Sequence, residues 1–304
     1  MISIKKYITV LVLSLFSLAA AATETINIVW GFSIASNQAN TVRALIDELN
    51  QSQTRYKFML VHKPGAGGSI AANYVAENPN NAVVSMSSSF IIRPYFEKTG
   101  THDLNNYRPI LVQGTGSPLV FVSGKYTNIK QMLDATSISI GVSGIGSISH
   151  LAANGLTDPR RQINVVNFKS MPDAATAAAG QHVDLAVGFF PDIQSLIDAK
   201  KLHVLGYTGP DNIIGYPNLR LDQHKFKNIK MLTANYAIFA SKNMDPARLE
   251  ELHNLLIRAN NTILVRNSYA RDHINTVNLN LTQSLEWYNT ERVYWQQQVS
   301  QLKK

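Results

Sequence analysis

Short apolar runs and stretches of helical period alternate along the chain. Near its start, three apolar runs predict strands: Ile26–Trp30, Tyr56–His62 and Asn81–Ser87. Between the first two, Ala39–Leu49 has apolar residues at the spacing of one helix face, and Ser36 or Asn37 can cap that helix. Repeated strand–loop–helix units imply a parallel sheet. Ligands of open α/β sheets bind at the carboxyl ends of the strands.

A second series of such units runs from about Ser123 to Leu221. Its predicted strands are Ser137–Val142, Val165–Phe168, Val183–Val187 and His203–Tyr207. Its predicted helices are Ile129–Leu133, a stretch from about Ser147 to Leu156, Pro172–Ala179 and Ile193–Ala199. Gly180 follows the alanine-rich helix, as a C-terminal cap often does.

The chain crosses between the two series twice. Arg108–Gln113 and Leu119–Val122 predict two short strands, with the breaker cluster Gly114–Pro118 between them. Ala234–Ala240 predicts a returning strand, and three helices follow: Pro246–Leu264, Ser268–Ile274 and Leu285–Leu302. The aromatic residues of the last helix, Trp287, Tyr288, Tyr294 and Trp295, are expected to pack against the body.

This organisation predicts an α/β protein of two domains with a ligand cleft between them. We place one discontinuous domain at 23–122 with 225–304, and the other at 123–224. The cleft is the default ligand site in such a protein, and hinge bending about the crossing strands is the expected motion.

The N-terminus has the pattern of a secretory signal. Lys5 and Lys6 precede an apolar stretch from Tyr7 to Ala22 that ends in alanines. The stretch is short for a membrane-spanning helix and no basic cluster follows it. We therefore expect residues 1–22 to be removed, leaving a periplasmic protein that begins at Thr23.

Composition narrows the class of protein further. The chain of 304 residues has no cysteine, so neither disulfides nor a lipid-acceptor cysteine is available and a large core must stabilise it. The net charge of +8 is compatible with an anionic ligand, although a basic solvated surface accounts for it equally well. No basic run interleaved with aromatic residues indicates nucleic acid. We expect a monomer.

The glycine-rich turn Lys63–Asn73 lies between a predicted strand and a predicted helix. Glycines let the backbone approach a ligand closely, and a helix start attracts anions through its free N–H groups. Ala66 and Gly67 are therefore candidate ligand-binding residues. A turn that only needs tight packing explains the same pattern. The spacing fits neither of the common nucleotide-binding loops.

A second glycine- and serine-rich turn, Ser143–Leu151, again leads into a helix. Its hydroxyl and N–H groups suit a carboxylate, which accepts several hydrogen bonds from neutral donors. Ser143, Gly146, Ser147 and His150 are candidates here, with Ser147 as a plain helix cap the equal alternative.

Further candidates come from the loops after the first and third strands and after Val187. They are Phe32, Ser36, Asn37, Ser87, Ser88 and Phe190. Phe32, Phe189 and Phe190 favour an apolar or aromatic carboxylate if they line the cleft, and are core residues otherwise. The sequence offers no metal-ligand spacing and no nucleophile elbow, and we expect no cofactor.

Four stretches together resemble the Bug-type extracytoplasmic receptors of tripartite tricarboxylate transporters. Lys63–Ile70 is similar to the family's proline- and glycine-rich second loop, and Ser143–Leu151 to its serine/glycine loop. Two further stretches also resemble sequence motifs of this family. One is Val166–Lys169 together with Gly180–Leu185, and the other is Ala199–Leu202. The resemblance covers about Ile26 to Trp295.

The resemblance implies a two-domain, type II-like periplasmic binding protein that captures a small carboxylate through backbone amides and hydroxyls. Delivery to a membrane permease, or to a sensor kinase, would follow. Two departures stand out. Ile34–Ala39 lacks the glycines and the acid usual in the family's first loop, and Gly188 and Phe189 stand where the family often has Asp-Asn. Without acidic residues near the cleft, an amino-acid ligand is disfavoured.

Two other readings stay open at this point. A sensory or scaffold protein could keep the receptor fold with a degenerate site, as the altered first loop allows. A secreted hydrolase could use Ser143 or His150, provided that the two side chains meet and a third group orients them.

Overall fold

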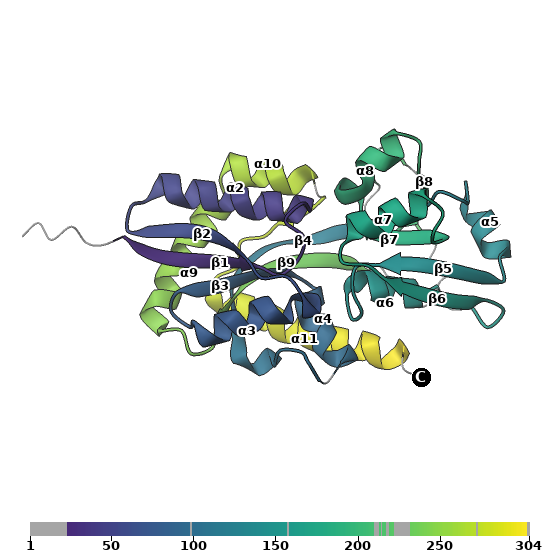
Figure 1. The fold of residues 1–304 in the computed structure, drawn as a ribbon. Coiled ribbons are helices and arrows are strands. Elements are labelled where there is room, and N and C mark those ends of the chain that lie inside the picture. The colour runs from purple at the N-terminus through teal and green to yellow at the C-terminus, as the bar shows by residue number, and fades with distance from the viewer. Residues whose placement is uncertain are drawn as a thin grey trace, which may run out of the picture.

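The computed structural model describes residues 23–302, except 98, 157, 210–212, 214, 217–218, 222–231 and 272. The predicted signal at 1–22 thus lies outside the described residues. Two lobes lie end to end, with a continuous strand running from one into the other (Figure 1). Within the described part of the chain, no helix is both long and apolar enough to cross a membrane.

The first lobe contains the predicted parallel strands. β1 (Glu24–Trp30) pairs in parallel with β2 (Tyr56–His62) on one side and with β3 (Ala82–Ser87) on the other. The helices α2 (Asn37–Ser52) and α10 (Ile263–Arg271) cover one face of this sheet. The other face is covered by α3 (Ser69–Glu77), α4 (Ser89–Phe96) and α11 (Leu281–Leu302) (Figure 1). All six residues of β3 are buried, as expected for a strand with helices on both faces.

The second lobe repeats the pattern. β5 (Ser137–Val142) lies between β6 (Gln162–Asn167) and β7 (Leu185–Phe189), parallel to both. Its helices are α5 (Ile129–Asp134), α6 (Ile148–Asn154), α7 (Met171–Ala179) and α8 (Phe190–Asp198). α8 begins three residues before the predicted start, because Pro191 falls in its first turn.

The crossing segments differ from the prediction in one respect. Instead of two short strands, β4 (Tyr107–Ser123) is a single strand of 17 residues. It pairs antiparallel with β9 (Thr233–Ser241) in the first lobe, and with β7 and β8 (His203–Tyr207) in the second. The predicted breaker cluster appears as register shifts between Val112, Gly114 and Ser117. Pairing with β9 therefore carries the strand through residues that locally favour a break.

The C-terminal helices also shift. The predicted helix over Pro246–Leu264 ends earlier, as α9 (Pro246–Asn260), because Asn261 and Thr262 close it against its last carbonyls. The predicted helix over Ser268–Ile274 lies earlier in the chain, as α10. Between α10 and α11, the two-residue β10 (Asn275–Thr276) pairs with β4. The predicted packing of the last helix is confirmed, since Tyr288 and Trp295 are fully buried.

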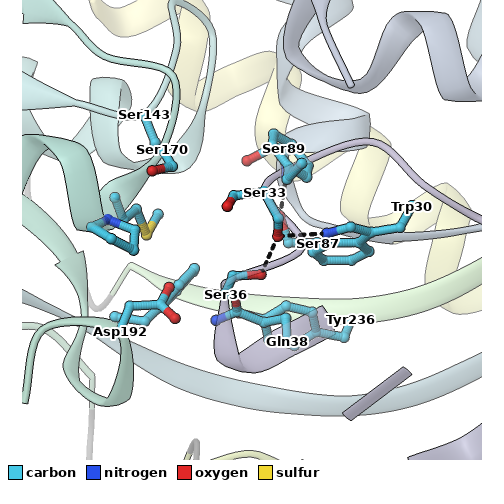
Figure 2. A pocket seen from close by; sticks show the side chains of 14 residues that line it. Trp30, Ser33, Ser36, Gln38, Ser87, Ser89, Ser143, Ser170, Asp192 and Tyr236 are labelled. Atoms are coloured by element: carbon cyan, nitrogen blue, oxygen red, sulfur yellow. Dashed lines mark hydrogen bonds between the residues drawn. The ribbon is translucent and has the colours of Figure 1, made fainter. Parts of the chain in front are cut away.

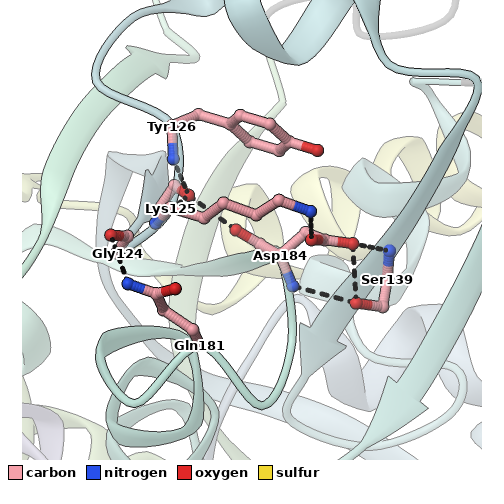
Figure 3. A network of polar contacts seen from close by, with 7 residues as sticks. Gly124, Lys125, Tyr126, Ser139, Gln181 and Asp184 are labelled. Carbon is pink, nitrogen blue, oxygen red and sulfur yellow. Dashed lines mark hydrogen bonds and ion pairs between the residues drawn. The ribbon is translucent and has the colours of Figure 1, made fainter.

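A polar cluster holds the far end of the second lobe together (Figure 3). Asp184 accepts hydrogen bonds from the backbone and hydroxyl of Ser139, at 2.8 and 2.9 Å, and pairs with Lys125 at 2.6 Å. Burial alone would raise the pKa of Asp184, but these bonds lower it. This acid, part of the Gly180–Leu185 stretch, joins β5 to the start of β7.

The predicted domain limits stay a prediction. The limit at 122–123 falls at the end of β4, which pairs within both lobes. The limit at 224–225 lies outside the described residues.

Candidate functional site

A pocket of about 430 Å³, its open mouth included, lies between the two lobes. The first lobe contributes residues at the carboxyl ends of β1 and β3, and the second contributes residues after β5, β6 and β7. Parallel strands of both lobes thus point their ends at one space, as predicted. Its lining comprises Trp30, Phe32, Ser33, Ser36, Gln38, Ser87, Ser89, Ser143, Ser170, Met171, Pro172, Phe189, Asp192 and Tyr236 (Figure 2).

The loop after β1 is ordered by its own hydrogen bonds. The carbonyl of Ser33 accepts from the Trp30 indole at 3.0 Å and from the Ser36 hydroxyl at 2.8 Å. Ser36 also caps α2 by accepting from the N–H of Ala39, which confirms one of the two predicted caps. The altered first loop therefore has a defined shape without the family's glycines.

Three serines of the pocket wall keep a hydroxyl proton available. Ser33 accepts from the N–H of Ala35, Ser87 from that of Ser89, and Ser89 from that of Ile148. No hydrogen bond within the described residues uses the O–H of these three side chains as its donor. A hydroxyl that already accepts from a backbone N–H directs its own proton elsewhere. Three such donors in one pocket suit an anionic acceptor.

The apolar part of the wall is large. Trp30 and Phe32 pack edge to face, with ring centroids 5.8 Å apart, and Phe189 lies 6.0 Å from Tyr236. Met171 and Pro172 face them from α7. This wall fits a ligand with an apolar body.

An acid, Asp192, lines the pocket, contrary to the expectation of none near the cleft. It occupies the first turn of α8, and its Oδ1 accepts from the N–H of Asn37 at 2.8 Å. Burial raises the pKa of Asp192 to about 6, while the Asn37 N–H and the Gln38 amide favour the ionised form. No lysine, arginine or histidine is among the described residues that line the pocket, so the formal charge of this lining is negative at neutral pH.

Four of the twelve predicted residues line the pocket: Phe32, Ser36, Ser87 and Ser143. Asn37 and Ser88 lie beside it and make hydrogen bonds within the protein, Asn37 through its backbone and Ser88 through its hydroxyl. The N–H of Asn37 binds Asp192, and the Ser88 hydroxyl accepts from the N–H of Asn235 at 2.9 Å. Phe190 is buried in the core of the second lobe and is not part of the wall.

The glycine-rich turn, with Ala66 and Gly67, is not part of the wall either. Four successive residues, Gly65 to Gly68, have positive φ, which explains the composition of the turn. A Cβ on Gly67 would lie 2.6 Å from Arg93, and one on Gly68 2.1 Å from Met86. The contacts of this turn are thus those of tight packing.

The hydroxyl groups of the second turn, Ser143–Leu151, also make most of their hydrogen bonds within the turn itself. Ser147 caps α6 and accepts from the N–H of His150 at 3.2 Å. Ser149 contacts the hydroxyls of Ser143 and Ser147, at 3.1 and 2.9 Å. Among the four candidates of this turn, only Ser143 reaches the pocket wall, and Gly146, Ser147 and His150 do not.

The geometry does not form the alternative hydrolase pair. His150 Nδ1 accepts from the N–H of Gly146 at 3.0 Å, and Nε2 contacts the amide of Asn154 at 3.2 Å. Both ring nitrogens are therefore engaged away from Ser143. Burial lowers the pKa of His150, so the ring is neutral at neutral pH. Over the described residues, no group of three or more acidic or histidine side chains is placed to hold a metal ion.

Arg93 on α4, which the sequence does not single out, joins the two lobes. It donates to the carbonyl of Ile145 at 2.6 Å and pairs with Glu97 at 2.6 Å. The Ser89–Ile148 hydrogen bond and the contact between the rings of Phe96 and His150, 4.9 Å apart, lie on the same side of the cleft. The Asn37–Asp192 bond closes the other side. Only the spatial arrangement of the lobes identifies these contacts.

Comparison with known proteins gives a consistent result. Residues 42–302 match the family described as tripartite tricarboxylate transporter family receptor. A UPF0065 protein from the TAR-I ttuE–ttuC' intergenic region of Agrobacterium vitis is 24% identical over 233 residues. That match spans 71% of this chain and 66% of the relative, just under two thirds of its length.

Solved structures share the fold at low sequence identity. The periplasmic binding protein BugD has a TM-score of 0.81 at 18% identity, over 92% of this chain and 98% of BugD. Rpa4515 of R. palustris with adipate has a TM-score of 0.81 at 16% identity, over 93% of this chain and 98% of Rpa4515. MatC of Rhodopseudomonas palustris with bound malate has a TM-score of 0.79 at 14% identity, over 91% of this chain and 99% of MatC. The predicted two-domain receptor fold is confirmed.

Proposed function

The chain belongs to the receptor family of the tripartite tricarboxylate transporters, and we propose that it captures a small organic carboxylate between its lobes and delivers it to a transporter of this type. Proteins of this family are periplasmic solute-binding receptors and not enzymes. The proposal concerns the finer points: the class of ligand, the residues that hold it and the fate of the complex.

The observation that carries the proposal is the set of available hydroxyl protons. Ser33, Ser87 and Ser89 each accept a backbone N–H, which leaves their O–H groups to donate into the pocket. A carboxylate accepts several such bonds, and bonds to an ionised acceptor are stronger than neutral ones. Neutral donors hold the anion without a basic residue in the wall.

Closure of the lobes over the ligand is the second part of the proposal. Ser89 supports both functions, because its oxygen accepts from Ile148 of the other lobe while its proton remains free for the ligand. Arg93 and Asn37 add interlobe hydrogen bonds on opposite sides of the cleft. The register shifts at Gly114–Ser117 in β4 give the hinge a place to bend.

Delivery follows from the location that the N-terminus predicts. A mature chain from Thr23, free in the periplasm, would carry its carboxylate to the membrane permease subunits. A sensor kinase is the alternative recipient of the closed complex. The ordered first loop and the intact pocket wall support a working site over a degenerate one.

Serine variants test the proposed ligand contacts. We expect Ser89→Ala and Ser87→Ala to weaken carboxylate binding by about tenfold each, the usual effect of removing a hydrogen bond to a charged group. Ser195→Ala, which removes an exposed hydroxyl of α8, is the matched control. Isothermal titration calorimetry of the three variants with the same carboxylate decides the matter. Equal affinities in all three would remove the proposed hydroxyls from the ligand site.

A further inference from the structure

The two ends of the pocket differ in chemistry. Ser89, Ser143 and Ser170 lie towards one end of the view in Figure 2, and Asp192 and Gln38 towards the other. The rings and apolar side chains of the wall, among them Trp30 and Met171, complete the lining. Of the three available hydroxyl donors, Ser89 lies at the first end, and Ser33 and Ser87 lie between the two ends. Asp192, the formal charge among the described lining residues, lies at the other end.

The Asp192 end has an acceptor that the protein does not fully use. Oδ1 receives the N–H of Asn37, and no hydrogen bond from the described residues reaches Oδ2. Gln38 is only 7% exposed, and its Nε2 makes no hydrogen bond of normal geometry within the described residues, although its amide is near enough to Asp192 to favour the ionised carboxylate. Buried polar groups without partners are rare, and those that line a pocket are candidates for ligand contacts.

Building on the proposed function, we infer that the pocket selects an amino carboxylate, whose carboxylate meets the serine hydroxyls and whose ammonium group pairs with Asp192 across an apolar body. A partly buried carboxylate without a cationic partner is costly, and a ligand ammonium supplies that partner. A second ligand carboxylate at this end would face Asp192 directly. Asp192 is therefore the residue that sets specificity between amino carboxylates and dicarboxylates.

Few other charges act on this end of the pocket. Neighbouring elements bring titratable groups near α8: Asp173 on α7, whose carboxylate accepts from Ser170, and His273, whose ring lies 6.3 Å from that of Phe190. α8 itself also has Asp198, and α2 has Arg43, Asp47 and Glu48. None of these contributes to the pKa of Asp192, which burial raises to about 6 against the Asn37 N–H and the Gln38 amide.

Ligand pairs of equal length provide the test. δ-Aminovalerate and glutarate, and ε-aminocaproate and adipate, differ only in the group at one end. In calorimetric titrations of the mature wild-type protein at pH 7.5, the amino member of a pair should bind about tenfold more tightly or better. Asp192→Asn keeps an acceptor for the Asn37 N–H but removes the charge, so it should abolish or reverse this preference. Asp198→Asn, on the exposed end of the same helix, should leave it unchanged.

A pH series of the wild-type protein tests the inference without any variant. Protonation of Asp192 below about pH 6 removes the attraction for ammonium and the repulsion of a second carboxylate. The preference for the amino member should therefore shrink as the pH falls from 7.5 to 5.5, and Asp192→Asn should not show this change with the same ligands.

The outcomes separate this inference from the proposed function. If glutarate and adipate bind more tightly than their amino partners, and Asp192→Asn leaves that order unchanged, the specificity inference is wrong while the carboxylate receptor stands. If neither series binds to the folded protein, both fail.

Discussion

The backbone N–H of Asn37 donates a 2.8 Å hydrogen bond to the carboxylate of Asp192 across the cleft, although 155 residues separate the two in the chain. Asn37 is the first residue of α2, where N–H groups lack intrahelical partners and the helix dipole favours an anion. Asp192, in the second lobe, thus accepts an N–H group of the first lobe that has no partner within its helix. Its formal charge lies at the rim of the cleft.

The partly buried carboxylate of Asp192 gives a first prediction, on stability. The pKa of Asp192 is about 6 in the folded protein against 3.8 for the free group, so between these values the folded state binds more protons than the unfolded state. Its contribution to the free energy of unfolding is therefore fully present below pH 4 and is lost as the pH rises through 6. Asp192→Asn should be the more stable protein at pH 7.5, by on the order of 1–3 kcal/mol.

Urea denaturation of both proteins between pH 4 and 7.5 measures this difference. The pair must be compared at each pH, because burial lowers the pKa of His102 to about 4 and acts in the opposite direction over the same range. The gap between the variant and the wild type should widen up to about pH 6 and then stay constant. A gap independent of pH would show that Asp192 titrates normally.

Glycine substitutions separate backbone strain from packing in the glycine-rich turn. Gly68 has φ +93°, and an added Cβ would lie 2.1 Å from Met86. Gly100 also has positive φ, at +69°, but nothing lies within 4 Å. We expect Gly100→Ala to cost about 1 kcal/mol of unfolding free energy from its φ alone, and Gly68→Ala to cost about 2–4 kcal/mol. Thermal unfolding of both variants tests the prediction, and equal losses would contradict it.

Arg93 provides a prediction on closure. Arg93→Met removes the hydrogen bond to Ile145 of the other lobe, while Glu97→Gln removes only the ion pair within α4. Because the first bond exists only when the lobes meet, Arg93→Met should weaken carboxylate binding by about tenfold, and Glu97→Gln should leave it nearly unchanged. Calorimetric titration distinguishes the two. Similar losses in both variants would remove the interlobe bond from the account of closure.

Ser147 provides the opposite case, a serine that supports the fold and does not line the pocket. Its hydroxyl caps α6, so Ser147→Ala should cost about 1 kcal/mol of stability. Carboxylate affinity should fall less than in Ser89→Ala. Paired denaturation and binding measurements on these two variants test this. A larger binding loss in Ser147→Ala would support direct anion binding by the second turn.

Local patterns predicted most of the fold. The strands β1, β2 and β3, the cap at Ser36 and the two-lobed arrangement all follow from neighbouring residues in the chain. The continuity of β4 does not, because Gly114–Pro118 locally favours a break and only pairing with β9 overrides it. The end of α9 at Asn260, four residues before the predicted end, depends on capping by Thr262 that periodicity does not reveal.

The residues that form the candidate site were harder to predict from the sequence than the fold. Four of the predicted residues line the pocket, but the two glycine-rich turns make their contacts mainly within the protein, in packing and helix capping. Asp192 looks like an ordinary acid in the first turn of a helix, and Arg93 like a helix residue with an (i, i+4) partner. Their roles arise from contacts between segments far apart in the chain.

The most direct test of the central claim is a thermal-shift titration of the mature protein from Thr23 with carboxylates and with their uncharged amides. A ligand that binds only the folded state raises the unfolding temperature in a saturable way. A receptor whose serine hydroxyls hold an anion should respond to at least one carboxylate, with the amino carboxylates strongest, and should not respond to the matching amide. A folded protein that no carboxylate stabilises, or that acid and amide stabilise equally, would contradict the account.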